Sequence, residues 1–107
     1  KQITIYWRDI PSQIILKRGR TKTKEILSPR FQKAIDRAAM RAGKGGSEAY
    51  IEEWRRETIE IDNDADPFLV VEAEVLAIDS RYSDGDLEAL VKNKGVARTA
   101  LSAHRNT

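Results

Sequence analysis

The alternation of apolar and polar residues at the start of the chain predicts two paired β-strands. Residues 2–8 (QITIYWR) place both isoleucines and Trp7 on one face, which is the period of a strand. In residues 9–12 (DIPS) the aspartate and the proline favour a turn. Residues 13–18 then run back, so we expect an antiparallel hairpin.

Residues 29–42 carry the clearest helical pattern of the chain. Ser28 and Pro29 supply an N-cap and a proline at the first helical position, and Gly43 follows the last apolar residue. The apolar stripe is mostly alanine, so another backbone can approach it closely. The opposite face is predicted to be a positive ridge of Arg30, Lys33, Arg37 and Arg41.

The remaining patterns predict three more helices and one more strand. Ser47 is expected to cap a helix over residues 48–56 that forms a helical hairpin with the first helix, and residues 58–61 are expected to form a strand. Asp66 and a following proline begin a helix that runs to residue 82, and Ser83 begins a short helix that ends at Gly95. The apolar residues expected to face inward are Tyr50, Ile51 and Trp54 in the helix over residues 48–56, and Phe68, Leu69, Val71, Val75, Leu76, Ile78 and Tyr82 in the helix that follows the strand.

Together these elements predict a single α+β domain over residues 1–95. The order β-β-α-α-β-α-α implies a small, mostly antiparallel sheet of about three strands, with helices packed on one face. A length of 107 residues suits one domain with one core. Residues 96–107 have a weak pattern of apolar residues and a slight excess of basic ones, and we expect them to form a loose tail.

The composition excludes several kinds of protein. The chain has no cysteine, which rules out disulfides, thiolate zinc sites and a cysteine nucleophile. No stretch approaches the roughly 18 consecutive apolar residues of a membrane helix, and we expect a cytoplasmic protein. A charged content of 34% predicts a surface rich in ion pairs.

Patterns typical of catalysis and metal binding are weak. The single histidine, His104, lies in the expected tail, so a catalytic triad would lack its base. Residues 61–67 (IDNDADP) lack the glycine and the terminal glutamate of a calcium loop, and we interpret them as a solvated loop that caps the next helix. We therefore expect no enzyme activity, no metal site and no cofactor.

The glycine-rich stretch RAGKGGSEAY, residues 41–50, is a weak candidate for anion binding. Lys44, Gly45, Gly46 and Ser47 precede a predicted helix, whose backbone N–H groups and dipole favour negative charge. The spacing fits neither a P-loop nor a dinucleotide fingerprint. A plain turn between two helices is the favoured interpretation.

Charge is divided unevenly along the chain. Residues 1–45 carry 12 Lys and Arg against 3 acidic residues, whereas residues 46–107 carry 7 against 14. The two halves can pack together and neutralise each other, or the basic half can bind an acidic protein. A nucleic acid is the alternative, since Tyr6 and Trp7 would stack on bases, although Trp7 shares its face with isoleucines and is expected in the core. The cations that would contact phosphates are Lys17, Arg18, Arg20, Lys22 and Lys24.

Three stretches, YWRDIPSQ, RFQKAIDRAAMRAG and YIEEW, resemble a known family. They are similar to the small bacterial domain family named "virulence factor", which occurs as short alphaproteobacterial proteins and as the terminal domain of HEAT-repeat proteins of the conserved virulence factor C type. The resemblance covers residues 3–92. The matching positions are Tyr6, Trp7, Arg8, Asp9, Pro11, Arg30, Phe31, Ala34, Ile35, Asp36, Ala39, Met40 and Trp54.

The resemblance implies an accessory module rather than an enzyme. It suggests a subunit or stabilising partner of a cytosolic enzyme complex, and the gene neighbourhood of the family points to one-carbon metabolism with folate- or corrinoid-dependent methyl transfer. Among the matching positions, the hydrophobic ones in the first helix and Trp54 are expected in the core. These core positions are Phe31, Ala34, Ile35, Ala39 and Trp54.

The polar matching positions have two interpretations. Arg8 and Asp9 can join Arg30, Asp36 and Arg37 in a network that locks the hairpin onto the first helix, or the arginines can point outward toward a partner. The residues predicted to bind a partner are Tyr6, Arg8, Asp9, Lys17, Arg18, Arg20, Arg30, Arg37 and Arg41.

Overall fold

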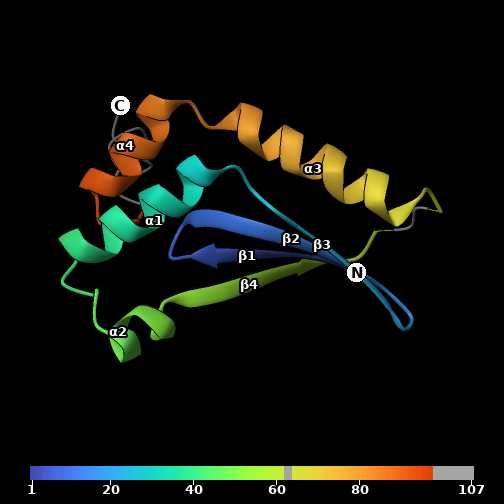
Figure 1. Ribbon diagram of the computed structural model, residues 1–107, viewed down its shortest axis with the longest axis horizontal. Helices are drawn as coiled ribbons and strands as arrows, with labels where there is room; N and C mark the ends of the chain where they lie inside the picture. The colour runs from blue at the N-terminus through green and yellow to red at the C-terminus, as the bar shows by residue number, and fades with distance from the viewer. Residues whose placement is uncertain (62–63, 98–107) are drawn as a thin grey trace, which may run out of the picture.

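A computed structural model describes residues 1–61 and 64–97, which form a twisted sheet packed against helices. The sheet has four strands in the order β3-β2-β1-β4, and all neighbouring strands are antiparallel (Figure 1). The α+β class and the N-terminal hairpin are confirmed, whereas most of the expected tail, residues 98–107, lies outside the described residues. The strands are β1 (Gln2–Trp7), β2 (Ile10–Arg18), β3 (Thr21–Ile26) and β4 (Trp54–Ile59).

Strand β3 corrects the expected strand count from three to four. Its sequence, TKTKEI, shows no apolar alternation because it is an edge strand whose side chains are mostly exposed. Gly19 adopts a left-handed φ of 55° after β2, and the chain returns beside β2 with Arg18 opposite Thr21 and Gln13 opposite Ile26. Pairing with β2, rather than burial of its own side chains, makes this segment a strand.

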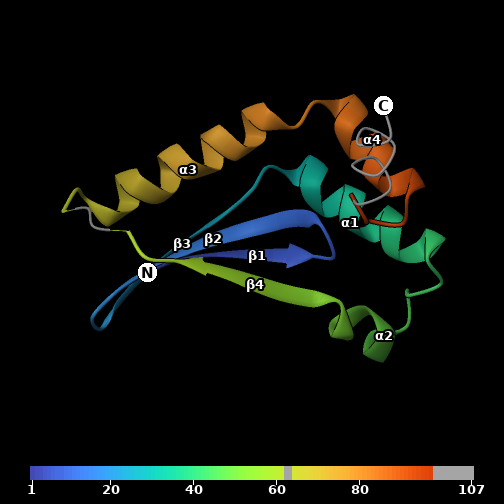
Figure 2. The same cartoon turned by 180° about the vertical axis from the view of Figure 1, so that it is seen from behind.

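Four helices occur in the part of the chain that the structure describes. α1, α3 and α4 lie along one side of the sheet, and α2 lies apart from them beside the start of β4 (Figures 1 and 2). α1 packs against α4, so the expected helical hairpin of the first two helices is wrong. The helices are α1 (Pro29–Arg41), α2 (Ser47–Glu52), α3 (Pro67–Arg81) and α4 (Asp84–Lys92).

The boundary between α2 and β4 also differs from expectation. The helix ends at Glu52 instead of residue 56, and the strand covers Trp54–Ile59 instead of residues 58–61. Trp54 stands opposite Trp7 in the sheet, and Tyr50 makes ring contacts with both, at centroid distances of 5.8 Å to Trp7 and 5.7 Å to Trp54. Aromatic packing across strands takes Trp54 out of the helix. The third predicted inward residue of this helix, Ile51, is exposed.

The core fills the space between the sheet and the helices α1, α3 and α4. Trp7 is fully buried, as its alternating position predicted. The predicted core positions of the first helix, Phe31, Ala34, Ile35 and Ala39, are also buried and are confirmed. Leu87 and Val91 bring α4 onto the alanine stripe of α1.

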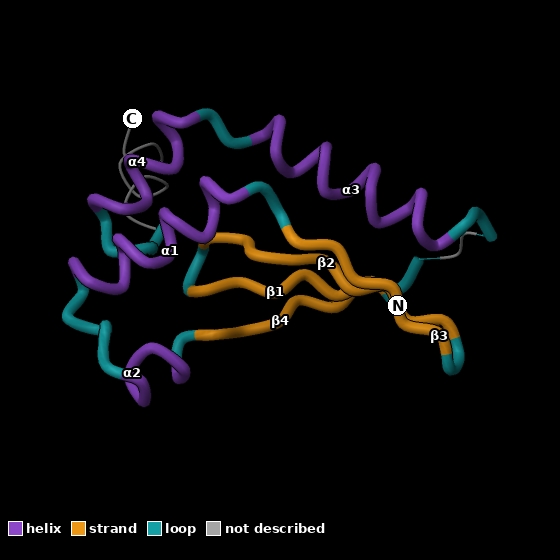
Figure 3. Tube along the Cα trace, viewed as in Figure 1, coloured by secondary structure: helices purple, strands orange, loops and turns teal. Residues whose placement is uncertain are grey.

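Helix α3 buries only part of its predicted apolar stripe. Val71 and Ile78 are buried, whereas Phe68, Leu69 and Leu76 are exposed by 53, 59 and 64%. The prediction that these three face inward is wrong because α3 packs over β2 and β3 and leaves β1 and β4 uncovered on its other flank (Figure 3).

The sheet register assigns side chains to two faces. Residues directly opposite each other on neighbouring strands point the same way. Ile14 and Leu16 point toward α3 and the core, and Gln2 shares their face. We call the other side the open face, since α1, α3 and α4 lie along the first. The residues that the register places there include Ile3, Ile5, Gln13, Ile15, Lys17, Lys22, Lys24, Ile26, Arg56 and Thr58.

Candidate interaction site

The turn between β1 and β2 is held by Arg8, which has a left-handed φ of 53°. Its Nε donates to Oε1 of Glu53 at 3.1 Å, and one terminal nitrogen donates to the carbonyl of Lys94 at 3.1 Å. Its backbone N–H donates to the carbonyl of Glu53. A non-glycine residue in this region of φ is costly, and these three hydrogen bonds hold it there.

Asp9 fastens the same turn to the segment that follows α4. One carboxylate oxygen accepts from Arg55 at 3.0 Å and the other from the backbone N–H of Ala97 at 2.7 Å. The backbone N–H of Asp9 donates to the carbonyl of Gly95 at 2.8 Å. The expected network with Arg30, Asp36 and Arg37 is therefore wrong: Arg8 and Asp9 lock the hairpin onto β4 and the chain after α4, not onto α1.

The two aromatic residues before this turn are not available as a stacking platform. Trp7 is fully buried, and its Nε1 donates to the carbonyl of Tyr50 at 2.9 Å. Tyr6 lies on the opposite face from the basic hairpin residues, where the guanidinium of Arg55 lies 4.3 Å from the centre of its ring. Burial, together with the charge of Glu57, raises the pKa of Tyr6.

Arg30 is a hub between α1 and the junction of α3 with α4. Its guanidinium donates to the carbonyls of Asp79 and Tyr82 at 2.7 and 2.5 Å, and to the carboxylates of Asp79 and Asp84 at 3.2 and 3.1 Å. A hydrogen bond from Ser28 at 2.8 Å, joined by those from Arg30, lowers the pKa of Asp79. Arg30 is thus occupied within the molecule.

Arg37, about two turns further along α1, is paired with α4. Its two terminal nitrogens donate to the two carboxylate oxygens of Glu88 at 2.7 and 3.0 Å, a bidentate geometry. These hydrogen bonds lower the pKa of Glu88 and raise that of Arg37. Two of the predicted ridge arginines therefore hold helices together.

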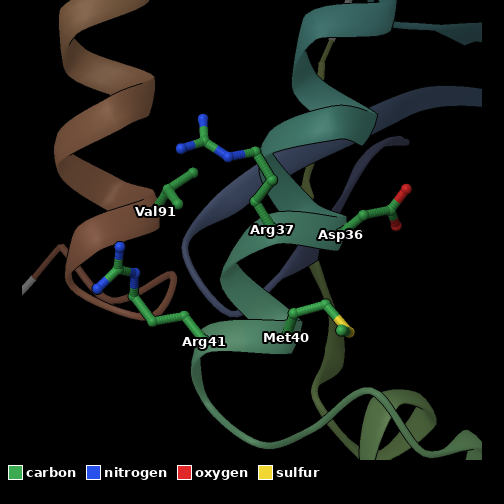
Figure 4. A pocket seen from close by; sticks show the side chains of 5 residues that line it. All are labelled: Asp36, Arg37, Met40, Arg41 and Val91. Carbon is green, nitrogen blue, oxygen red and sulfur yellow. The ribbon is translucent and has the colours of Figure 1, made fainter.

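A surface hollow lies between α1 and α4 at the far end of the ridge. Figure 4 shows Arg37 and Arg41 extending toward α4 and Val91, while Asp36 and Met40 extend from the other side of α1. Met40 is exposed by 73%. Among the residues that line the hollow, Arg37 is paired with Glu88 and Asp36 accepts a hydrogen bond from Gln32, so the hollow has the character of a helix junction.

The glycine-rich turn before α2 directs its lysine inward. Nζ of Lys44 lies 3.3 Å from Oε2 of Glu53, whose other oxygen, Oε1, accepts from Arg8. Burial disfavours ionised Glu53, but these hydrogen bonds outweigh it and lower its pKa. A Cβ at Gly45 would lie 3.0 Å from Sδ of Met40. Because Lys44 already has a carboxylate partner, the predicted anion site at Lys44, Gly45, Gly46 and Ser47 gains no support.

The open face gathers cations that have no such partners. Within residues 1–61 and 64–97, Lys17, Lys22, Lys24 and Arg56 form no ion pair. Lys17 stands directly opposite Lys22, and Lys24 stands opposite Ile15. Arg20, in the β2–β3 turn, is also exposed, whereas Arg18 points to the other face and donates to the carbonyl of Ala65 at 2.6 Å.

Arg56 was missed by the sequence analysis, which placed it in a helix. Lys22, Lys24 and Ile26 share this face because residues 21–26 pair with β2, and their sequence carries no apolar alternation that would indicate a strand. The register places Arg56 beside Ile5, so basic residues lie on both sides of the isoleucines of the open face.

Two features of the described residues concern metal ions and membranes. No three His, Asp or Glu side chains of residues 1–61 and 64–97 are arranged to hold a metal ion. No helix in this part of the chain is long and apolar enough to cross a membrane.

These features define a small α+β domain. The charged residues of its sequence motifs, Arg8, Asp9 and Arg30, form hydrogen bonds and ion pairs within the fold. The chain belongs to the virulence factor family, since the model of that family, described as "Virulence factor", matches residues 5–91. This confirms the resemblance that YWRDIPSQ and the first helix indicated. No curated protein and no solved structure matches the chain.

Proposed function

We propose that the domain is a non-catalytic interaction module that binds an acidic protein surface through the open face. The observation that carries this proposal is the set of cations Lys17, Lys22, Lys24 and Arg56 around the isoleucines of that face, none of them paired with a carboxylate in the described residues. Like charges directly opposite on neighbouring strands, such as Lys17 and Lys22, destabilise a sheet. An acidic partner relieves that repulsion.

The chemistry of the face favours an acidic amphipathic segment. Ile5 and Ile15 are half-buried and Ile26 is exposed by 63%, so apolar contact area lies between the lysines of the hairpin and Arg56. Charged borders around an apolar centre are typical of protein interfaces. From the family resemblance, the partner is a subunit of a cytosolic enzyme complex, with methyl-transfer enzymes the first to test.

A nucleic acid is the weaker alternative for the same cations. Binding of single strands relies on exposed aromatic rings next to basic groups. Trp7 is buried and Tyr6 lies on the other side of the sheet. The basic face therefore lacks the rings that the sequence placed beside it.

The test is co-purification from the native cell with a charge-reversed face. The tagged chain is expected to retain a protein with an acidic segment, and the double variant Lys22→Glu, Lys24→Glu is expected to lose it. Rising salt should release the partner, since exposed charge pairs are screened. The matched control, Lys33→Glu with Arg41→Glu on α1, makes the same charge change elsewhere and should retain it.

Two outcomes contradict the proposal. One is recovery of the chain with no other protein under gentle salt. The other is a captured species that nuclease treatment removes.

A further inference from the structure

Strand β4 is a border of the sheet with one side unpaired. It pairs with β1, and no described strand follows it in the order β3-β2-β1-β4 (Figures 1 and 3). An unpaired edge presents backbone N–H and C=O groups to any matching strand. The other border, β3, alternates lysines on its open face and is protected in the way natural edge strands usually are.

The hydrogen bonds of β1 fix which residues of β4 face outward. The backbone groups of Lys1 and Lys17 bond each other, so Lys1, Ile3 and Ile5 turn toward β2 and the residues between them turn toward β4. The partners of those intervening residues in β4 are residues 55, 57 and 59. Arg56 and Thr58 therefore turn their N–H and C=O groups away from the sheet.

The outward side of this segment is complementary to itself. If two copies of β4 pair antiparallel about a two-fold axis at Thr58, Arg56 of each copy stands opposite Glu60 of the other. Among residues 1–61 and 64–97 neither Arg56 nor Glu60 is in an ion pair. Opposite charges facing each other across strands stabilise pairing. An axis at Glu57 instead opposes two glutamates, and an axis at Ile59 places Glu60 opposite Thr58, so neither of these registers joins Arg56 to Glu60.

The face toward the helices supports the same arrangement. Ile59 is exposed by 53% and stands opposite Gln2, which lines an apolar groove between α3 and the sheet, where Leu69 is exposed by 59%. With the axis at Thr58, the two copies of Ile59 are diagonal neighbours on this face, within reach of each other. The groove is lined by Gln2, Ile61, Ala65, Leu69, Val70, Ala73, Glu74 and Ala77.

We propose that the chain forms a two-fold homodimer in which β4 pairs with β4 of a second copy, centred on Thr58, to give one continuous antiparallel sheet of both copies. The strand that occupies this edge is β4 of a second copy, because in the register centred on Thr58 each Arg56 faces Glu60 of the other copy. A two-fold interface must be self-complementary in this sense.

Sedimentation over a concentration series up to about 1 mM, where even a weak dimer is populated, measures the assembly. The wild-type chain is expected to shift to dimer mass. Arg56→Glu and Glu60→Arg should each raise the dimer dissociation constant at least about tenfold, because each opposes like charges twice. The combined variant restores both pairs and should recover the wild-type value. Lys24→Glu, on the opposite border, should leave it unchanged.

Two variants probe the edge directly. Thr58→Pro removes an outward N–H that β1 does not use, so the fold persists and the dimer is lost. Thr58→Cys is expected to form a disulfide between copies on mild oxidation, since the chain has no other cysteine, whereas Thr21→Cys on β3 should not.

A monomer at every concentration overturns the dimer proposal. So does cross-linking of Thr58→Cys that is no faster than that of Thr21→Cys. A variant that loses the acidic partner but still forms the dimer contradicts only the open-face proposal. A chain that binds the partner but stays monomeric contradicts only the dimer proposal.

Discussion

At the scale of single residues, Gly95 shows how closely the segment after α4 approaches the turn between β1 and β2. Gly95 has a left-handed φ of 88°, and its carbonyl accepts from the backbone N–H of Asp9. A Cβ there would lie 3.1 Å from Cζ3 of Trp7 and 3.4 Å from Cβ of Arg8. Glycine is thus required here for two reasons, the left-handed backbone angle and the lack of space for a Cβ.

Gly95→Ala is accordingly expected to lower the free energy of unfolding by about 2 kcal/mol, from the left-handed backbone and the crowding of Trp7. Urea unfolding followed by Trp fluorescence measures this. Gly46→Ala is the matched control, because Gly46 has a φ of −75° and open space around its Cβ position. Equal stabilities for the two variants would contradict the close approach.

Also at this scale, Arg8 and Asp9 have a structural explanation. Their side chains form hydrogen bonds with Glu53, Arg55 and Ala97. Binding of a partner by Arg8 and Asp9 stays a prediction. The hydrogen bonds that they form within the fold explain both residues without a partner.

At the scale of elements, Arg30 joins α1 to the end of α3 and the start of α4. The geometry uses several donors of one guanidinium, which lysine cannot reproduce. Arg30→Ala should lower the free energy of unfolding by about 2 kcal/mol, as expected for hydrogen bonds to charged groups. Lys33→Ala, on the same helix, should change it by less than about 0.5 kcal/mol. Chemical denaturation of both variants decides, and similar values would contradict a special role of Arg30.

The same junction predicts sensitivity to acid. The pKa values of Asp79 and Glu88 are lower in the fold than their ordinary 3.8 and 4.5, because Ser28, Arg30 and Arg37 donate hydrogen bonds to the carboxylates. The unfolded chain then binds more protons at low pH. Stability from these pairs is complete above the ordinary pKa values and is lost as the pH falls through the lower, folded ones.

Unfolding experiments between pH 6 and pH 3, roughly the range of carboxylate titration, measure this dependence. The double variant Asp79→Asn, Glu88→Gln is expected to be less stable near neutrality and to lose less stability on acidification. An unchanged slope in the variant would show that other carboxylates carry the effect.

At the scale of the whole molecule, the uneven charge of the sequence is resolved in two ways. The acidic half supplies partners to α1, to Arg8 and to Lys44, so much of the basic half is neutralised within the fold. The cations of the β2–β3 hairpin face the other side of the sheet, where Arg56 joins them. Neutralisation between the two halves is therefore confirmed for α1, Arg8 and Lys44, whereas binding of an acidic protein by the hairpin cations stays a prediction.

By itself the sequence determined the elements whose signals are local. Alternation in residues 2–8, the Ser28-Pro29 and Asp66-Pro67 helix starts, and the apolar face of the first helix each act within a few residues, and the structure has them where they were expected. Only the tertiary structure decided that TKTKEI is a strand and that Trp54 belongs to the sheet. It also decided which groups Arg8 binds, at Glu53 and Lys94, which are 45 and 86 positions away. Edge pairing and ion pairs depend on which distant segments meet, and the pattern of neighbouring residues carries no record of that.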